Sequence, residues 1–187
     1  MAGASFGPCG PNNARQRNRI QVSQIVSNRL FSIAKKNLLT GVSGCNLNAD
    51  IRMALLMTNT TVDTENDGIE NLGDFTTLDE CNGANYARRA LSTATPTVAI
   101  DTARDSVKLS CASHPVFPNL GAGSRSIAGV LFYFNILDDD NQSVPFLYCP
   151  YTTPRNPDGG NFTVELPADK VLIEFFQAAI GTDPVTL

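Results

Sequence analysis

The sequence contains a single histidine, His114, and no tryptophan. One imidazole excludes every site that needs two, including the common zinc hydrolase arrangements. The five cysteines, none of them in a C-x-x-C pair, are Cys9, Cys45, Cys81, Cys111 and Cys149. Their odd number and wide spacing favour neither a disulfide framework nor a cysteine-based zinc site. We therefore expect reduced thiols, mostly buried, and no cofactor.

Long apolar runs are also missing. No stretch approaches the roughly 18 consecutive apolar residues that a membrane span needs, and residues 1–18 lack the apolar centre of a secretory signal. The 187 residues are 42% apolar and 17% charged, which is typical of one soluble domain with an additional arm. We expect a chain that neither enters a membrane nor is exported.

Acidic residues are absent from the first 49 positions, and the first of them is Asp50. That segment carries six of the 14 cations, so the remaining residues hold eight cations against all 18 acids. The six are Arg15, Arg17, Arg19, Arg29, Lys35 and Lys36. A basic segment on an acidic body points to an anionic partner, and the alternative is a solvated tail. Because the body is acidic, we expect an acidic protein surface rather than direct contact with nucleic acid.

The N-terminal region divides into an arm and a helix. Residues 2–13 contain three glycines and two prolines, which predicts that residues 1–18 form a flexible, extended basic arm that orders on a partner. Apolar residues then recur at helical spacing from about residue 19 to residue 39. Lys35 and Lys36 suit a last helical turn, and Gly41 suits a stop. We predict one helix there.

The chain after the helix reads as short strands between polar turns. The strongest run is Ile127–Leu137, which we expect to be a central strand because water on either face would be costly. The other strand candidates are 50–58, 85–93, 96–100, 106–111, 144–151, 162–166 and 170–176. This pattern predicts a mainly β fold, an antiparallel β-sandwich with a jelly-roll-like body, with residues 19–187 forming a single domain.

One loop approaches the pattern of a twelve-residue calcium site. Its candidate ligands are Asp63, Glu65, Asp67 and Asp74, with Gly68 at the sixth position. The match is weak, because position 3 is normally Asp or Asn, position 12 is normally Glu, and a strand precedes the loop. A solvated acidic loop is the alternative. Residues 138–141 are also acidic, but between strands they are typical of an ordinary turn.

No catalytic pattern emerges. The glycine-rich residues 121–129 precede a strand, whereas a dinucleotide-binding loop must lead into a helix. Ser124 lacks the Gly-x-Ser-x-Gly elbow, and His114 precedes a proline, which disfavours a Ser-His triad. We expect a structural or binding protein, not an enzyme.

Several segments match one family in order along the chain. They are Lys35-Lys-Asn-Leu-Leu-Thr-Gly41, Asp50-Ile-Arg-Met-Ala-Leu-Leu-Met-Thr-Asn-Thr-Thr61, Asp63-Thr-Glu-Asn-Asp-Gly68, the run from Leu78 to Arg88, the glycine-rich lead from Leu120 to Val130, and Pro157-Asp-Gly-Gly-Asn-Phe-Thr-Val164. Over about residues 35–177, the chain resembles a broad family of tailed-bacteriophage virion structural proteins. Arg52 and Met53 stand where that family usually has Lys and Val. The resemblance implies a place in a virus particle.

A compact β body with an arm suits the outside of a phage head. We expect a capsid decoration or cement protein at the capsid surface, made in the host cytoplasm, that links neighbouring major capsid proteins. Self-association as a dimer or trimer would add valency. The expected partner-binding residues are Arg15, Arg17, Arg19 and Arg29. A neck or tail ring component, a fibre-attachment module and a glycan-binding module are the alternatives.

Overall fold

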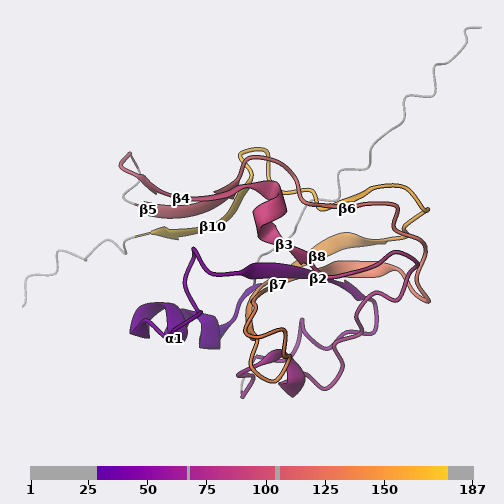
Figure 1. Ribbon diagram of the computed structural model, residues 1–187, viewed down its shortest axis with the longest axis horizontal. Coiled ribbons are helices and arrows are strands. Elements are labelled where there is room, and N and C mark those ends of the chain that lie inside the picture. The colour runs from indigo at the N-terminus through magenta and orange to yellow at the C-terminus, as the bar shows by residue number, and fades with distance from the viewer. Residues whose placement is uncertain (1–28, 67, 104–105, 177–187) are drawn as a thin grey trace, which may run out of the picture.

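The computed structural model describes residues 29–66, 68–103 and 106–176 (Figure 1). Within them the fold is mainly β, with antiparallel sheets and one α-helix, α1 (Ser32–Thr40). Two short 3-10 helices, Leu72–Asp74 and Leu91–Ala94, lie in the connections. The predicted arm, residues 1–18, and the first part of the predicted helix lie outside the described residues.

The larger sheet has five antiparallel strands in the order β1-β8-β7-β2-β3. Their bounds are β1 (Arg29–Leu30), β2 (Ile51–Met57), β3 (Arg89–Ala90), β7 (Ile127–Phe134) and β8 (Val144–Arg155). The central strand is β7, which pairs with β2 on one side and β8 on the other. All of its residues except Ala128 are buried, which confirms the predicted central strand, although the strand ends at Phe134 and not at Leu137.

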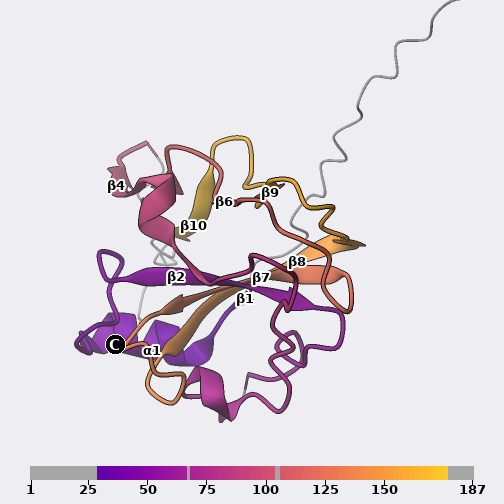
Figure 2. The ribbon, with the colours of Figure 1, turned by 45° about the vertical axis from the view of Figure 1, so that its right-hand side comes forward.

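Two smaller sheets complete the fold. A three-stranded sheet has the order β10-β5-β4, formed by β4 (Pro96–Asp101), β5 (Ser106–Cys111) and β10 (Val171–Phe176). A two-stranded sheet pairs β6 (Val116–Phe117) with β9 (Phe162–Thr163). Figures 1 and 2 place β4 and β10 on one side of β2 and β7, and α1 on the other side.

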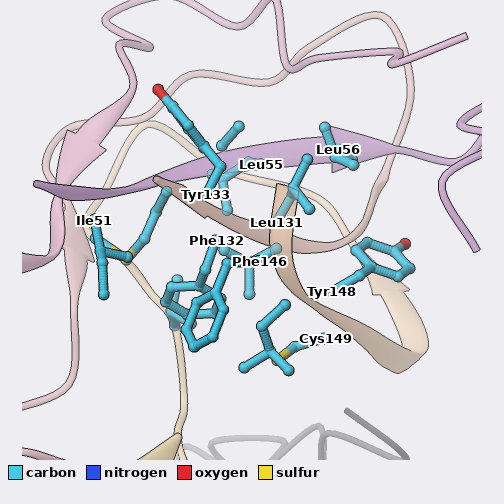
Figure 3. Packing of buried hydrophobic residues seen from close by; sticks show 14 of the residues in the cluster. Ile51, Leu55, Leu56, Leu131, Phe132, Tyr133, Phe146, Tyr148 and Cys149 are labelled. Carbon is cyan, nitrogen blue, oxygen red and sulfur yellow. The ribbon is translucent and has the colours of Figure 1, made fainter. Parts of the chain in front are cut away.

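Side chains of β2, β7 and β8 form the centre of the core (Figure 3). Phe132, Tyr133 and Phe146 are at most 1% exposed. The rings of Phe134 and Phe146 lie 4.9 Å apart between centroids. Fully burying a side chain of this size contributes about 1.5–3 kcal/mol, so the three central strands form the stable centre of the molecule.

The helix is shorter than predicted. Residues Arg29 and Leu30 form β1 instead, pairing with Tyr148 and Leu147. The N–H of Phe31 continues this ladder by donating to the Phe146 carbonyl over 3.1 Å, and α1 begins at the next residue. The prediction of a helix through residues 29–31 was therefore wrong, because pairing with β8 satisfies the same backbone groups that a helix would.

The strand predicted over residues 85–93 is also mostly absent. Only β3 pairs, and a 3-10 helix follows directly from Leu91. Asn85 has a φ of 62°, in the left-handed region that strands do not use. The side chains of Tyr86 and Arg88 both bind Glu80, and these contacts hold residues 85–88 in a turn.

Gly129 is a point of close approach between β7 and β8. A Cβ atom there would lie 2.7 Å from the Cys149 carbonyl oxygen and 2.8 Å from the Tyr148 hydroxyl oxygen. We expect Gly129→Ala to lower the free energy of unfolding in urea by about 1–3 kcal/mol, as overpacking of a core does. Gly160→Ala is the control, because its nearest atom is the end of the exposed Asp158 side chain. Equal effects of the two substitutions would contradict this prediction.

Candidate interaction surface

The strand β5 alternates between a polar face and an apolar face. On the polar face, the Ser106 hydroxyl donates to Glu174 over 2.5 Å, and the Lys108 ammonium lies 2.5 Å from a carboxylate oxygen of Asp101. On the other face, Leu109 is fully buried against the core. Val107 lies two residues earlier on the same face, yet it is 36% exposed. The apolar face therefore extends beyond the core.

That uncovered part is a row of three apolar side chains across the sheet. The strand register places Ile100 of β4 and Phe175 of β10 directly opposite Val107. Ile100 is 76% exposed and Phe175 is half-buried. The next row inward, which contains Leu109, is packed against the core. Exposed apolar rows of this kind mark binding surfaces more often than isolated apolar residues do.

Val107 and Phe175 form one wall of a hollow of about 490 Å³. We call this the apolar hollow; it is lined by Leu30, Lys35, Leu38, Leu39, Leu47, Val107 and Phe175. Its volume falls in the range of about 300–1,000 Å³ that binding pockets occupy. Lys35 is the one charged side chain in that lining. A second hollow of about 460 Å³ shares Leu30 and Phe175 and follows β10.

The helix α1 supplies the opposite wall. Ala34 and Asn37 face the core, and the helix ends at Gly41, whose φ of 67° places it in the left-handed conformation common at helix C-termini. Leu38 packs partly against the core, while Leu39 is 88% exposed at the hollow. Successive residues of a helix point about 100° apart, and with Leu38 at the edge of the buried face, its neighbour Leu39 lies beyond that face. The adjacent leucines Leu38 and Leu39 indicate an exposed apolar surface already in the sequence, and we missed that signal.

Of the predicted partner-binding arginines, the structure describes only Arg29. Its guanidinium donates a hydrogen bond to the backbone carbonyl of Asp63, so it fastens β1 to the loop after β2. Arg15, Arg17 and Arg19 lie outside the described residues. The structure therefore gives Arg29 a role within the body.

Two of the four predicted calcium ligands, Glu65 and Asp74, accept hydrogen bonds from the loop's own backbone. The Asp74 carboxylate accepts hydrogen bonds from the N–H groups of Glu70 and Asn71. The Glu65 carboxylate accepts one from Thr76, and hydrogen bonding by Thr76 lowers the pKa of Glu65. Asp67 lies outside the described residues, and the part of the chain that is described holds no group of three metal-binding side chains.

Arg88 is the centre of a network of charges that no sequence pattern predicted. The Arg88 guanidinium donates to both oxygens of Glu80, over 2.9 Å and 2.7 Å, and also to Asp140, 52 residues away. The Tyr86 hydroxyl donates to Glu80 over 2.6 Å and accepts from the N–H of Leu55. The predicted acidic turn at 138–141 is thus a turn whose Asp140 also ties it to a second loop.

Hydrogen bonds and burial keep Arg88 charged and the Tyr86 hydroxyl protonated. Hydrogen bonding to Asp140 raises the pKa of Arg88, so the guanidinium stays charged. Burial, together with the neighbouring Glu80 carboxylate, raises the pKa of Tyr86, so its hydroxyl remains a donor. Arg88 also lies over the Tyr133 ring, 5.4 Å from the centroid. The arrangement acts as a structural clamp between two loops.

The remaining candidates have structural partners. The Nδ1 atom of His114 accepts from the N–H of Leu166, and Ser124 exchanges two hydrogen bonds with Asn82. The four described cysteines are buried and unpaired, as predicted, and Cys9 lies outside the described residues; the four are Cys45, Cys81, Cys111 and Cys149. Burial raises the pKa of Cys111 to about 11, so this thiol stays protonated at neutral pH.

No helix among the described residues has both the length and the apolar character required to cross a membrane. Comparisons with protein-family models, with curated proteins and with solved structures found no match. Function must therefore be argued from the residues and the geometry of this chain.

Proposed function

We propose that this chain is a structural protein of a tailed-phage particle, a decoration or cement protein that binds the outer surface of the head. In this role it links neighbouring major capsid proteins, associates as a dimer or trimer, and catalyses no reaction. The five-stranded and three-stranded sheets would then form the two layers of a sandwich. The fully buried Leu109, on the inward face of the smaller sheet, supports that arrangement.

The observation that carries the proposal is the division of charge. Four of the eight cations that follow Asp50 form ion pairs with carboxylates of the body, and three of these pairs are Arg52 with Asp50, Arg88 with Glu80, and Arg125 with Asp79. Lys108 pairs with Asp101 and Glu174 in the same way. The basic residues that precede Asp50 thus supply the positive charge for an acidic partner surface.

Binding to undecorated capsids tests this proposal. We expect the triple substitution of Arg15, Arg17 and Arg19 by alanine to weaken binding by on the order of tenfold, about 1.4 kcal/mol, and to reduce its dependence on salt. Substitution of Arg125 by alanine is the control, since this body cation already pairs with Asp79. Unchanged affinity in the triple variant would refute the role of the arm.

Copy number separates the head from the tail. Quantifying the protein in purified particles should give hundreds of copies per particle if it covers the head, whereas six or twelve copies would favour the neck or tail alternative. Absence of the protein from purified particles would refute both readings.

A further inference from the structure

We propose that residues 177–187 of this chain bind in the apolar hollow, against Leu39 of α1 and Phe175 of β10. The inference concerns the chain itself and does not depend on the virion role. It identifies the hollow as an internal docking site for the segment that follows β10.

Connectivity brings this segment to the hollow. Phe175 lines the hollow, β10 ends at Phe176, and Gln177 follows directly. Ile180 comes five residues after Phe175, and five residues can span up to about 16–18 Å. Gly181 permits a reversal of direction just beyond it. The segment can therefore enter the hollow without any displacement of β10.

The composition of the segment matches the lining. Its apolar residues are Ala178, Ala179, Ile180, Val185 and Leu187. Apart from Lys35, every side chain that lines the hollow is apolar, so burying these residues there removes apolar surface on both sides from water. Leu39 is 88% exposed, so docking of the segment would remove a large part of its apolar surface from water.

Charge complementarity also favours residues 177–187 over the N-terminal residues as the occupant of the hollow. Its one charged side chain is Asp183, and the hollow carries Lys35 with Lys36 beside it on α1, a helix without acidic residues. Asp183 follows Ile180 by three residues, a span of at most about 10 Å, so its carboxylate can reach these ammonium groups when Ile180 occupies the hollow. The basic residues of the first 28 positions would instead meet like charge at Lys35.

The absence of tryptophan makes the test direct, because one introduced indole is the sole tryptophan of the full chain. Ile180→Trp and, separately, Val185→Trp should each give emission that is blue-shifted from that of the urea-unfolded chain and protected from acrylamide. Adding Leu39→Glu should abolish both effects. Leu137→Glu is the matched control, since Leu137 is 81% exposed and does not line the hollow.

Three results would overturn the proposal. Solvent-like emission from both tryptophan variants would show that the segment does not dock. Equal effects of Leu39→Glu and Leu137→Glu would show that the shift arises elsewhere. A blue shift that grows with protein concentration would show that the segment docks onto another copy rather than onto its own chain. If Leu39→Glu alters the far-ultraviolet circular dichroism, Val107→Glu takes its place, with the same loss expected.

Discussion

Phe31→Ala is expected to lower the free energy of unfolding by about 3–5 kcal/mol, the range for removing a fully buried aromatic ring. Phe31 is completely buried, and its ring meets Phe75 edge-on with centroids 5.6 Å apart. Its backbone joins β1 to the start of α1. Losing the ring therefore leaves a cavity at the junction of the helix, the sheet and the loop after β2. Urea unfolding followed by circular dichroism measures the change.

The substitution Leu137→Ala is the control for Phe31→Ala, because it shortens a large apolar side chain that is 81% exposed and lies outside the apolar hollow. We expect a change within about 0.5 kcal/mol. Native-state amide exchange should also show faster opening of α1 in Phe31→Ala than in the control. Similar stabilities of the two variants would mean that Phe31 does not hold the helix in place.

The second large effect is expected from Arg88→Ala. Removing the guanidinium leaves the carboxylates of Glu80 and Asp140 without their common partner. Breaking a buried ion pair costs about 3–5 kcal/mol, and the partial exposure of this one, with Arg88 24% and Glu80 23% exposed, reduces our expectation to about 2–3 kcal/mol. Thermal and urea unfolding at neutral pH measure it.

Arg52→Ala provides the comparison, since Arg52 also bridges two acids, Asp50 and Asp138, but these are 45% and 69% exposed. A loss of at most about 1 kcal/mol is expected there, because solvent screens exposed pairs. If the two variants lose the same stability, the clamp around Arg88 contributes no more than a surface ion pair.

The sequence was most informative where local pattern and tertiary environment agree. The predicted strand at 106–111 has the bounds of β5, because alternating residues there meet alternating polar and apolar surroundings. The run from Ile127 predicted the central position of β7, because a strand that is apolar on both faces must be covered on both. Local alternation and burial were sufficient in both cases.

Prediction failed where contacts between residues far apart in the sequence determine the local structure. The apolar spacing around Phe31 fits a helix, yet partners more than 100 residues away in β8 draw Arg29 and Leu30 into a strand. Arg88 gave no local signal, since its partner Asp140 is 52 residues distant. The apolar hollow arises only when α1 and the three-stranded sheet come together. No local pattern in one sequence contains these juxtapositions.

Burial of the four described thiols has a consequence for chemistry on the chain. Oxidants outside a cell act on exposed thiolates, and these sulfur atoms are both covered and protonated. The body can therefore persist in air-saturated fluid without cross-linking to other molecules through Cys45, Cys81, Cys111 or Cys149. Because these four thiols are buried, a cysteine introduced on the surface of the body would react faster than any of them, and it could carry a dye or an affinity tag.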